Sequence, residues 1–256
     1  MTRRRFHAPP EAFAPGGGAV VLSEEESRHL RDVLRLRAGD EASVFDGEGR
    51  EFACVVAEAG GRGGRAARLE VRGPAEPPAP ESPLELTLAV ALLKGEKFDL
   101  VVQKATELGA TRLVPVETRR ADVRLRDARD AGRRVERWRR LALEAAKQSG
   151  RARVPTVAPP RPFESLAAAA PGERTPRVMF AERGGAGLDS LAAGFGGGRR
   201  ELTALVGPEG GWEDEETEFA RSHGWRVVTL GGRTLRAETA AVTACALLQH
   251  LFGDLR

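Results

Sequence analysis

The chain has few of the residues that build disulfide frameworks, metal centres or membrane anchors. Its 256 residues include four histidines and two cysteines, Cys54 and Cys245, which lie far apart in the sequence. Two such cysteines provide neither a disulfide framework nor a zinc-binding spacing, so we expect no metal and a reducing compartment. No apolar stretch approaches the length of a membrane-spanning helix, and the N-terminal arginines precede no apolar core of the secretory type. We therefore expect a cytoplasmic protein with no membrane partner.

The charge of the chain is distributed unevenly. The formal net charge is only +3, but residues 84–160 carry 17 basic and 10 acidic side chains, an excess of seven. Residues 1–72 carry 12 of each kind, and residues 161–256 carry 11 basic and 13 acidic ones. Two interpretations remain open at this point. The excess is either a solvated, arginine-rich helix surface or a surface that binds a polyanion such as RNA.

A proline-rich segment separates two kinds of sequence pattern. Before it, residues 19–23, 41–60 and 65–73 have the alternating pattern of a small sheet or barrel. One helix interrupts these strands, with Ser23 as the expected N-cap and Glu26 completing a capping box. Residues 73–83 contain five prolines, which predicts a stiff linker and a domain boundary.

After the linker, strand-like and helix-like segments alternate. Such alternation favours a parallel sheet covered by helices, with ligands at the carboxyl ends of the strands. The last helix is apolar almost all round, so it is expected to be buried in its own core or against a second subunit. We expect strands at residues 84–93, 112–118, 154–160, 177–183, 202–207 and 225–230, and helices at 97–109, 130–150 and 239–252 and directly after the segment 207–211.

Two glycine-rich loops follow two of these apolar strands, and each opens a helix. The first is LVGPEGGWEDEE, residues 205–216, and the second is GGRTLRAE, residues 231–238. A glycine-rich helix start usually suggests a phosphate site, but Glu209 and the four carboxylates of residues 213–216 would repel a phosphate. Each loop alone is a weak signal, since glycine and proline also build ordinary turns. These loops would suit a ligand that makes close contact with the backbone and does not require a positively charged site.

Taken together, the motifs resemble the SPOUT methyltransferases, and in particular the bacterial 16S ribosomal RNA uridine-N3 methyltransferase family. The resemblance covers almost the whole chain, although Ala121 stands where the family usually has a serine. It rests on LVGPEGGW, TLGGRTLRAETAAVTA, RRRF, HLRDVLRLRAGDEASVFDGEG, KGEKFDLVVQKATELGATRLVPVETRRA and EAAKQSGRARVP. The resemblance implies an α/β protein. Its parts would be a PUA-like RNA-binding β-barrel at residues 1–72, the linker at 73–83 and a SPOUT methyltransferase domain with a trefoil knot at 84–256. A homodimer is implied as well.

The resemblance also implies S-adenosylmethionine as the cofactor. This molecule carries a sulfonium cation and no phosphate, so an acidic helix start is compatible with it, and glycines let the backbone approach its adenine and ribose. The expected cofactor-binding residues are Glu182, Val206, Gly207, Pro208, Glu209, Gly210, Gly211, Leu230, Gly231, Arg233, Leu235, Arg236, Thr239 and Ala240.

Methylation of uracil N3 requires that this nitrogen lose its proton and that the resulting anion be stabilised. A fixed arginine suits the second task, and Arg236 is the first candidate, with Arg233 behind it. Glu209 or Glu238 is a candidate base. Either could instead be structural, with Glu209 bracing the turn and Glu238 pairing with Arg236 or opening the last helix. Neither cysteine has the surroundings of an activated thiol, which disfavours methylation of uracil C5.

The expected RNA contacts are basic or polar side chains. For the lysines the alternative is a salt-bridged helix surface, and His29 could be an ordinary histidine. The candidate RNA contacts are Arg3, Arg4, Arg5, His29, Arg31, Arg35, Lys94, Lys97, Gln103, Lys104, Arg119 and Arg120.

We predict methylation of N3 of a uridine in 16S ribosomal RNA within the small ribosomal subunit. The alternatives are methylation of a ribose 2′-hydroxyl, a non-catalytic RNA-binding assembly factor and a phosphate-binding enzyme.

Overall fold

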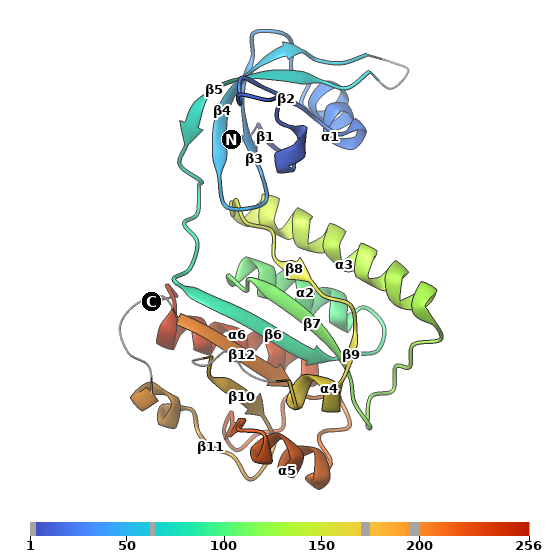
Figure 1. The fold of residues 1–256 in the computed structure, drawn as a ribbon, viewed down its shortest axis with the longest axis vertical. Coiled ribbons are helices and arrows are strands. Elements are labelled where there is room, and N and C mark those ends of the chain that lie inside the picture. Colours follow the sequence, from blue (N-terminus) through green and yellow to red (C-terminus); the bar gives the residue numbers. More distant parts are fainter. Residues whose placement is uncertain (1–3, 62–64, 170–174, 195–199, 256) are drawn as a thin grey trace. The chain divides into compact units, whose positions relative to one another are not determined.

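The structure is a computed structural model that describes residues 4–61, 65–169, 175–194 and 200–255. The chain divides into two compact units (Figure 1). The first unit consists of Met1–Glu81 and Ala146–Val154, and the second of Ser82–Ala145 and Pro155–Arg256. The first unit therefore includes a short segment that lies well beyond the proline-rich boundary predicted from the sequence.

The first unit is built on a five-stranded sheet with the strand order β1-β3-β4-β5-β2. Strand β1 pairs with β3 in parallel, and the other neighbours are antiparallel. Within the described residues β1 and β2 form the two edges and do not pair with each other, so the predicted barrel is an open half-barrel. The strands are β1 (Arg5–His7), β2 (Ala19–Val21), β3 (Glu41–Phe45), β4 (Glu51–Glu58) and β5 (Arg68–Ala75).

The predicted helix of this unit is short and changes its geometry. It consists of α1 (Glu24–Arg28), followed by one π-helical turn (His29–Val33). Ser23 caps α1 as predicted, because its hydroxyl accepts a hydrogen bond from the Glu26 N–H at 3.2 Å. The Glu26 carboxylate, which was expected to complete the capping box, forms an ion pair with Lys147 at 2.8 Å.

Strand β5 continues further than the sequence predicts. It runs through Pro74 to Ala75, although residues 73–75 were assigned to the linker. Strand β2 pairs only with the first three residues of β5, up to Glu70. Beyond Val71, whose N–H donates to the carbonyl oxygen of Gly18, no strand among the described residues pairs with this edge of β5, and a proline that lacks an N–H donor fits there.

The second unit contains a parallel sheet, as predicted. Its strand order is β11-β13-β10-β12-β6-β7-β8, with β9 also pairing with β7, and every pair of neighbours is parallel. The strands are β6 (Leu84–Ala91), β7 (Arg112–Glu117), β8 (Thr156–Val157), β9 (Arg161–Pro162), β10 (Arg177–Phe180), β11 (Ala186–Gly187), β12 (Arg200–Val206) and β13 (Arg226–Thr229).

Helices cover both faces of this sheet. Helix α6 lies along β12 and β6 and packs against α2 (Figure 1). Helices α4 and α5 close the opposite face over a cluster that includes Ala89, Met179 and Leu205. The helices are α2 (Lys97–Glu107), α3 (Ala128–Ser149), α4 (Phe163–Ala167), α5 (Asp214–Ser222) and α6 (Ala237–Phe252), with a 3-10 helix η3 (Leu188–Gly194). Strand β11 and η3 lie between β10 and β12, where the sequence analysis expected neither a strand nor a helix.

The last part of the chain returns across the sheet. Strand β13 borders β10 on the side away from β12, yet α6, which follows it, packs on β12 and β6. The chain must therefore pass back over β10, which is the path expected of the C-terminal segment that the resemblance describes as knotted. One side of α6 is buried, including Ala241, Cys245 and Leu248, whereas Val242 and Leu247 are only partly buried.

Candidate cofactor pocket and its surroundings

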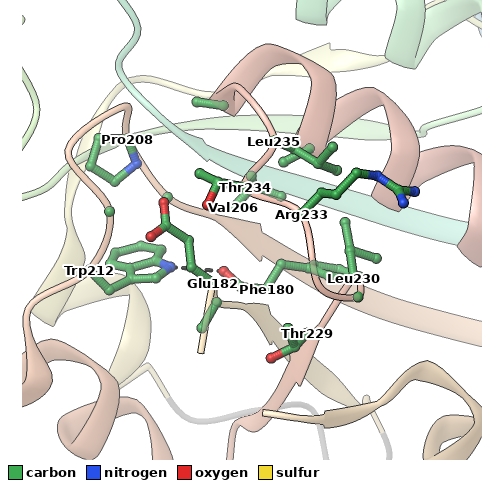
Figure 2. Close-up of a pocket in the computed structure, with 16 residues that line it drawn as sticks. Phe180, Glu182, Val206, Pro208, Trp212, Thr229, Leu230, Arg233, Thr234 and Leu235 are labelled. Carbon is green, nitrogen blue, oxygen red and sulfur yellow. Dashed lines mark hydrogen bonds between the residues drawn. The ribbon is translucent and has the colours of Figure 1, made fainter. Parts of the chain in front are cut away.

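A pocket lies at the carboxyl ends of β10, β12 and β13. These strands are neighbours in the parallel sheet, so the loops that follow them meet at one edge. In Figure 2, Pro208 and Trp212 stand on one side of the pocket, and Leu230, Arg233 and Leu235 stand on the other. The lining residues are Phe180, Ala181, Glu182, Val206, Gly207, Pro208, Gly211, Trp212, Thr229, Leu230, Gly231, Arg233, Thr234, Leu235, Ala237 and Ala240.

The first wall is the loop that follows β12. Close packing explains Gly207 in this loop, and backbone conformation explains Gly211. A Cβ atom on Gly207 would lie 2.8 Å from the indole ring of Trp212, so no larger residue fits without a shift. Gly211 has a φ of +70°, a conformation that glycine adopts without strain. A Cβ there would lie 3.5 Å from the carboxylate of Glu182, which comes from the end of β10 and lines the pocket. Both glycines line the pocket, so they present backbone to it without a side chain.

Gly210 has a different role from the one predicted. It does not line the pocket, and a Cβ atom on it would lie 2.9 Å from the carbonyl oxygen of Arg120. This glycine lets the loop pack against the turn formed by Arg119 and Arg120. Gly210 is therefore explained by the packing of the loop and not by contact with a ligand.

The second wall follows β13 and runs into the first turn of α6. It includes Gly231, whose φ is +105°, and Arg233, whose side chain is exposed. Arg236 is the N-cap residue of α6, and its side chain is also exposed. Within the part of the chain that the structure describes, no carboxylate pairs with Arg233 or Arg236. Both guanidinium groups are thus free to bind a substrate.

Ten of the fourteen residues predicted to bind the cofactor line the pocket, and Glu209, Gly210, Arg236 and Thr239 do not. Six further residues line the pocket: Ala181, which directly precedes the predicted Glu182, and five others that the sequence analysis did not select. Trp212 directly follows the GPEGG motif and Thr229 ends the strand before the second loop, so their position next to the motifs was an available signal. The residues not selected are Phe180, Trp212, Thr229, Thr234 and Ala237.

The acidic start of α5 is structural. Glu213 is the N-cap residue, and it forms a capping box with Glu216. Buried Glu216 also accepts a hydrogen bond from the Arg119 N–H at 3.1 Å, and Glu213 pairs with the Arg119 guanidinium at 3.0 Å. These carboxylates cap the helix and hold the neighbouring turn. Neither of the two lines the pocket, so they present no obstacle to its ligand.

The two candidate bases face away from the pocket. Glu209 pairs with Lys97 at 3.0 Å, and Glu238 lies 3.9 Å from the same ammonium group. Burial raises the pKa of Glu209, but hydrogen bonds from its own backbone, from Lys97 and from the Lys94 N–H outweigh it, so the pKa lies below its usual value. A carboxylate with a lowered pKa is a weak base near neutral pH. The contacts therefore favour bracing roles for both residues.

The two cysteines are not activated nucleophiles. Both side chains are buried. Burial raises the pKa of Cys54 to about 11, so this residue stays protonated near neutral pH. In accord with the sequence analysis, Cys54 lies in β4 of the first unit and Cys245 lies on the buried side of α6.

Most of the predicted RNA contacts are paired with carboxylates. The prediction that Arg5 contacts RNA is wrong, because its side chain is only 3% exposed and pairs with Glu51 at 2.9 Å. His29 is partly buried with its ring edge-on to Phe6, and Arg35 is exposed with an unusual φ of +56°. Lys94 and Gln103 are exposed, and Arg3 lies outside the described residues. The ion pairs are Arg4–Asp40, Arg31–Asp32, Lys97–Glu209, Lys104–Glu107, Arg119–Glu213 and Arg120–Glu213.

Neither a metal centre nor a membrane span is found in the described ranges. No three histidine, cysteine or carboxylate side chains gather there in a way that could hold a metal ion. No helix in the same ranges has the length and apolar character needed to cross a membrane.

Two family models match the chain. Residues 80–249 match a model described as an RNA methyltransferase domain, and residues 22–64 match one described as an RNA methyltransferase PUA domain. The ribosomal RNA small subunit methyltransferase E of Synechocystis is 34% identical over 255 residues, which cover 98% of this chain and 78% of the relative. The protein of the same name from Bacillus subtilis is 30% identical over 243 residues, covering 92% and 91%.

Solved structures agree with these matches. Ribosomal RNA small subunit methyltransferase E from Neisseria gonorrhoeae, bound to S-adenosyl methionine, is 31% identical with a TM-score of 0.85. The alignment covers 99% of this chain and all of that one. A methyltransferase from Legionella pneumophila, in complex with the bound cofactor SAM, is 28% identical with a TM-score of 0.85, and both chains are covered completely. These likenesses confirm the predicted fold class, a PUA-like domain followed by a SPOUT α/β domain.

Proposed function

Because this chain belongs to the family of ribosomal RNA small subunit methyltransferases E, we propose that it transfers a methyl group from S-adenosylmethionine to N3 of a uridine in 16S ribosomal RNA. The observation that carries this proposal is the pocket at the carboxyl ends of β10, β12 and β13. It is lined by the same two loops that carry the methyltransferase motifs. The resemblance and the geometry therefore lead to the same site.

The pocket suits S-adenosylmethionine better than a phosphate ligand. Gly207 and Gly211 present backbone to the pocket, and backbone amides and carbonyls can bind the edge of an adenine. The carboxylate of Glu182 lies at the pocket and is complementary to a cation such as the sulfonium group. When bound, S-adenosylmethionine supplies a methyl group made reactive by the sulfonium centre. The chain's part is to position it and to prepare the acceptor nitrogen.

Preparation of the acceptor falls to Arg236, with Arg233 beside it. Uracil N3 becomes nucleophilic only when it loses its proton, and the negative charge then spreads over O2 and O4. An unpaired guanidinium near these oxygens stabilises that anion and lowers the pKa of N3, so water can accept the proton. Arg233 lines the pocket, and Arg236 begins the helix that closes it. Since Glu209 and Glu238 both pair with Lys97, neither is needed as the base in this scheme.

We also propose a homodimer in the cytoplasm that acts on the small ribosomal subunit. Helix α6 leaves Val242, Ala246 and Leu247 only partly buried, which suits burial against a second subunit. The excess of basic residues at 84–160 suits an RNA substrate. The surface ion pairs of Arg4, Arg31, Lys104, Arg119 and Arg120 are weak enough to exchange a carboxylate for an RNA phosphate.

Mass spectrometry of nucleosides tests the proposed reaction. Small subunits that lack the modification are incubated with S-adenosylmethionine and the wild-type protein, Arg236→Ala or Arg226→Ala. Arg226 is an exposed arginine at the amino end of β13, away from the pocket, and serves as the matched control. We expect 3-methyluridine with the wild type and Arg226→Ala, and a rate lowered about 100-fold with Arg236→Ala.

Each other outcome has a definite meaning. If 2′-O-methylated nucleosides appear in place of 3-methyluridine, the acceptor is ribose and the proposed reaction is wrong. If no methylated nucleoside appears and the wild-type protein binds no S-adenosylmethionine in calorimetry, the chain is a non-catalytic RNA-binding factor. Equal methylation rates for Arg236→Ala and Arg226→Ala would show that Arg236 takes no part in catalysis.

A further inference from the structure

Lys97 lies behind the cofactor pocket, at the first residue of α2. Strand β6 ends at Ala91, and residues 92–96 lead from it into the helix. The Lys97 side chain is 35% exposed. Among the described residues, none that lines the pocket belongs to α2. Any effect of Lys97 on the cofactor must therefore act through other residues.

The first of these residues is Glu209, in the loop after β12. One oxygen of its carboxylate, Oε1, accepts hydrogen bonds from the Lys97 Nζ at 3.0 Å and from the Lys94 N–H at 3.3 Å. Both donors belong to the start of α2 and the loop before it. The carboxylate thus fixes the β12 loop to a single point on the neighbouring connection.

The second is Glu238, in the first turn of α6. Its Oε2 atom lies 3.9 Å from the Lys97 Nζ, and its side chain is only 12% exposed. Neither Glu209 Oε2 nor Glu238 Oε2 is accessible to solvent or has a hydrogen-bond partner among the described residues. Two partly buried carboxylates therefore share one ammonium group.

These contacts are made on the outer side of the two pocket walls. In the first wall Pro208 and Gly211 line the pocket, and Glu209 between them does not. In the second wall Ala237 and Ala240 line the pocket, and Glu238 between them does not. The same short segments thus face the ligand on one side and Lys97 on the other.

Removal of Lys97 would leave both carboxylates without their cation. Two negative charges in a partly buried region repel each other, and an unpaired buried carboxylate is costly. The simplest relief is for the loops to move apart and expose the carboxylates to water. Such a movement would widen the space between the walls in which the cofactor is expected to lie.

We propose that Lys97 is a positioning residue that holds the two cofactor loops at the spacing S-adenosylmethionine requires. The inference rests on the proposed function, because it takes S-adenosylmethionine as the ligand of this pocket. It also replaces the sequence-based prediction that Lys97 contacts RNA phosphates. To make such a contact the ammonium group would have to release Glu209, its hydrogen-bond partner at 3.0 Å.

The test compares Lys97→Met with Lys97→Arg and with Arg137→Met. Methionine keeps the length of the side chain and removes its charge, whereas arginine retains a cation that can reach both carboxylates. Arg137→Met is the matched control, because Arg137 on α3 pairs with Asp99 on the same helix α2 and does not line the pocket. Calorimetry measures the dissociation constant of S-adenosylmethionine, and steady-state kinetics measure the KM for RNA and its salt dependence.

We expect Lys97→Met to weaken binding of S-adenosylmethionine about tenfold and to change the KM for RNA less than twofold. Lys97→Arg should stay within about threefold of the wild type, and Arg137→Met should bind like the wild type. Glu209→Gln should weaken binding by itself, but combining it with Lys97→Met should add little further loss, because one interaction is removed twice.

Three results would overturn the proposal. Unchanged cofactor binding by Lys97→Met, with a raised KM for RNA and a salt slope reduced by about one, would make Lys97 a phosphate contact. If the losses of S-adenosylmethionine affinity in Lys97→Met and Glu209→Gln were fully additive in the double variant, the two residues would not act through one interaction. A loss for Lys97→Met that is equalled by Arg137→Met would indicate general destabilisation of α2. Failure of the wild type to bind S-adenosylmethionine at all would instead refute the proposed function.

Discussion

The indole Nε1 of Trp212 donates a hydrogen bond of 2.9 Å to the carbonyl oxygen of Phe180 (Figure 2). This bond joins the loop after β12 to the end of β10, two segments that line the pocket. The indole ring also packs beside Phe163, with ring centroids 5.4 Å apart. One side chain therefore sets both the position of the first wall and the packing beneath it.

Trp212→Phe should weaken binding of S-adenosylmethionine about fivefold. The phenyl ring keeps most of the packing, but the carbonyl of Phe180 loses its donor, and a net hydrogen bond contributes about 1 kcal/mol. Trp225→Phe is the matched control, because Trp225 donates a similar bond to the carbonyl of Ala167 at 3.1 Å, outside the pocket. Calorimetry should show weaker binding for the first variant only. Equal affinities of the two variants would contradict the prediction.

Gly207→Ala should reduce cofactor binding at least tenfold. The added methyl group would lie 2.8 Å from the Trp212 ring, so either the ring or the loop must shift. Gly232→Ala is the control, because Gly232 lies in the second loop with no atom within 4 Å of an added Cβ. We expect the control to bind S-adenosylmethionine within about twofold of the wild type. If both variants bind S-adenosylmethionine like the wild type in a titration, the loop after β12 can accommodate the added methyl group without disturbing the site.

Arg5→Met should destabilise the first unit by about 3–5 kcal/mol, because it leaves the Glu51 carboxylate buried without its cation. The two side chains are each only 3% exposed. The double variant Arg5→Met, Glu51→Leu should recover much of the loss, since an apolar pair of similar volume costs little. Denaturation in urea measures both. If the double variant is no more stable than Arg5→Met, the penalty lies in packing and not in the unpaired charge.

The free energy of unfolding should fall as the pH drops below about 6.5, and His7 should contribute to this fall. Burial lowers the pKa of His7, and Lys147 and Arg5 lower it further against the opposing effect of Asp46 and Glu11. The unfolded chain therefore takes up a proton on His7 at a higher pH than the folded chain does, so acid favours unfolding. His7→Phe should make the decline between pH 7 and pH 5 shallower. Identical pH profiles for the two proteins would exclude this contribution.

The sequence predicted the parts of the fold that depend on local pattern. The strands that became β6, β7, β10, β12 and β13 are mostly apolar segments, and Gly109 and Gly150 end their helices with φ values of +85° and +82°. The strand β1 was missed because its residues are mostly basic, and only the distant partner Glu51 shows that Arg5 is buried. Contacts between residues far apart in the sequence leave no periodic signal.

The same limit applies to the site. Ten pocket residues were predicted because they lie in or beside recognisable motifs. The outward direction of Glu209 and Glu238 was not predictable, because it depends on Lys97, more than 100 residues earlier in the chain. A motif identifies the segment that binds a ligand, but the partners on its other side come from the fold.

The placement of Ala146–Val154 in the first unit has a consequence for the order in which the protein forms during synthesis. Arg5 donates a hydrogen bond to the carbonyl of Arg151 at 2.8 Å, and Lys147 pairs with Glu26. Both partners are translated only after Ser82–Ala145 of the second unit. The N-terminal unit therefore cannot complete its contacts as soon as its own first stretch has left the ribosome tunnel. The last contacts of this unit can form only after the middle of the chain has been synthesised.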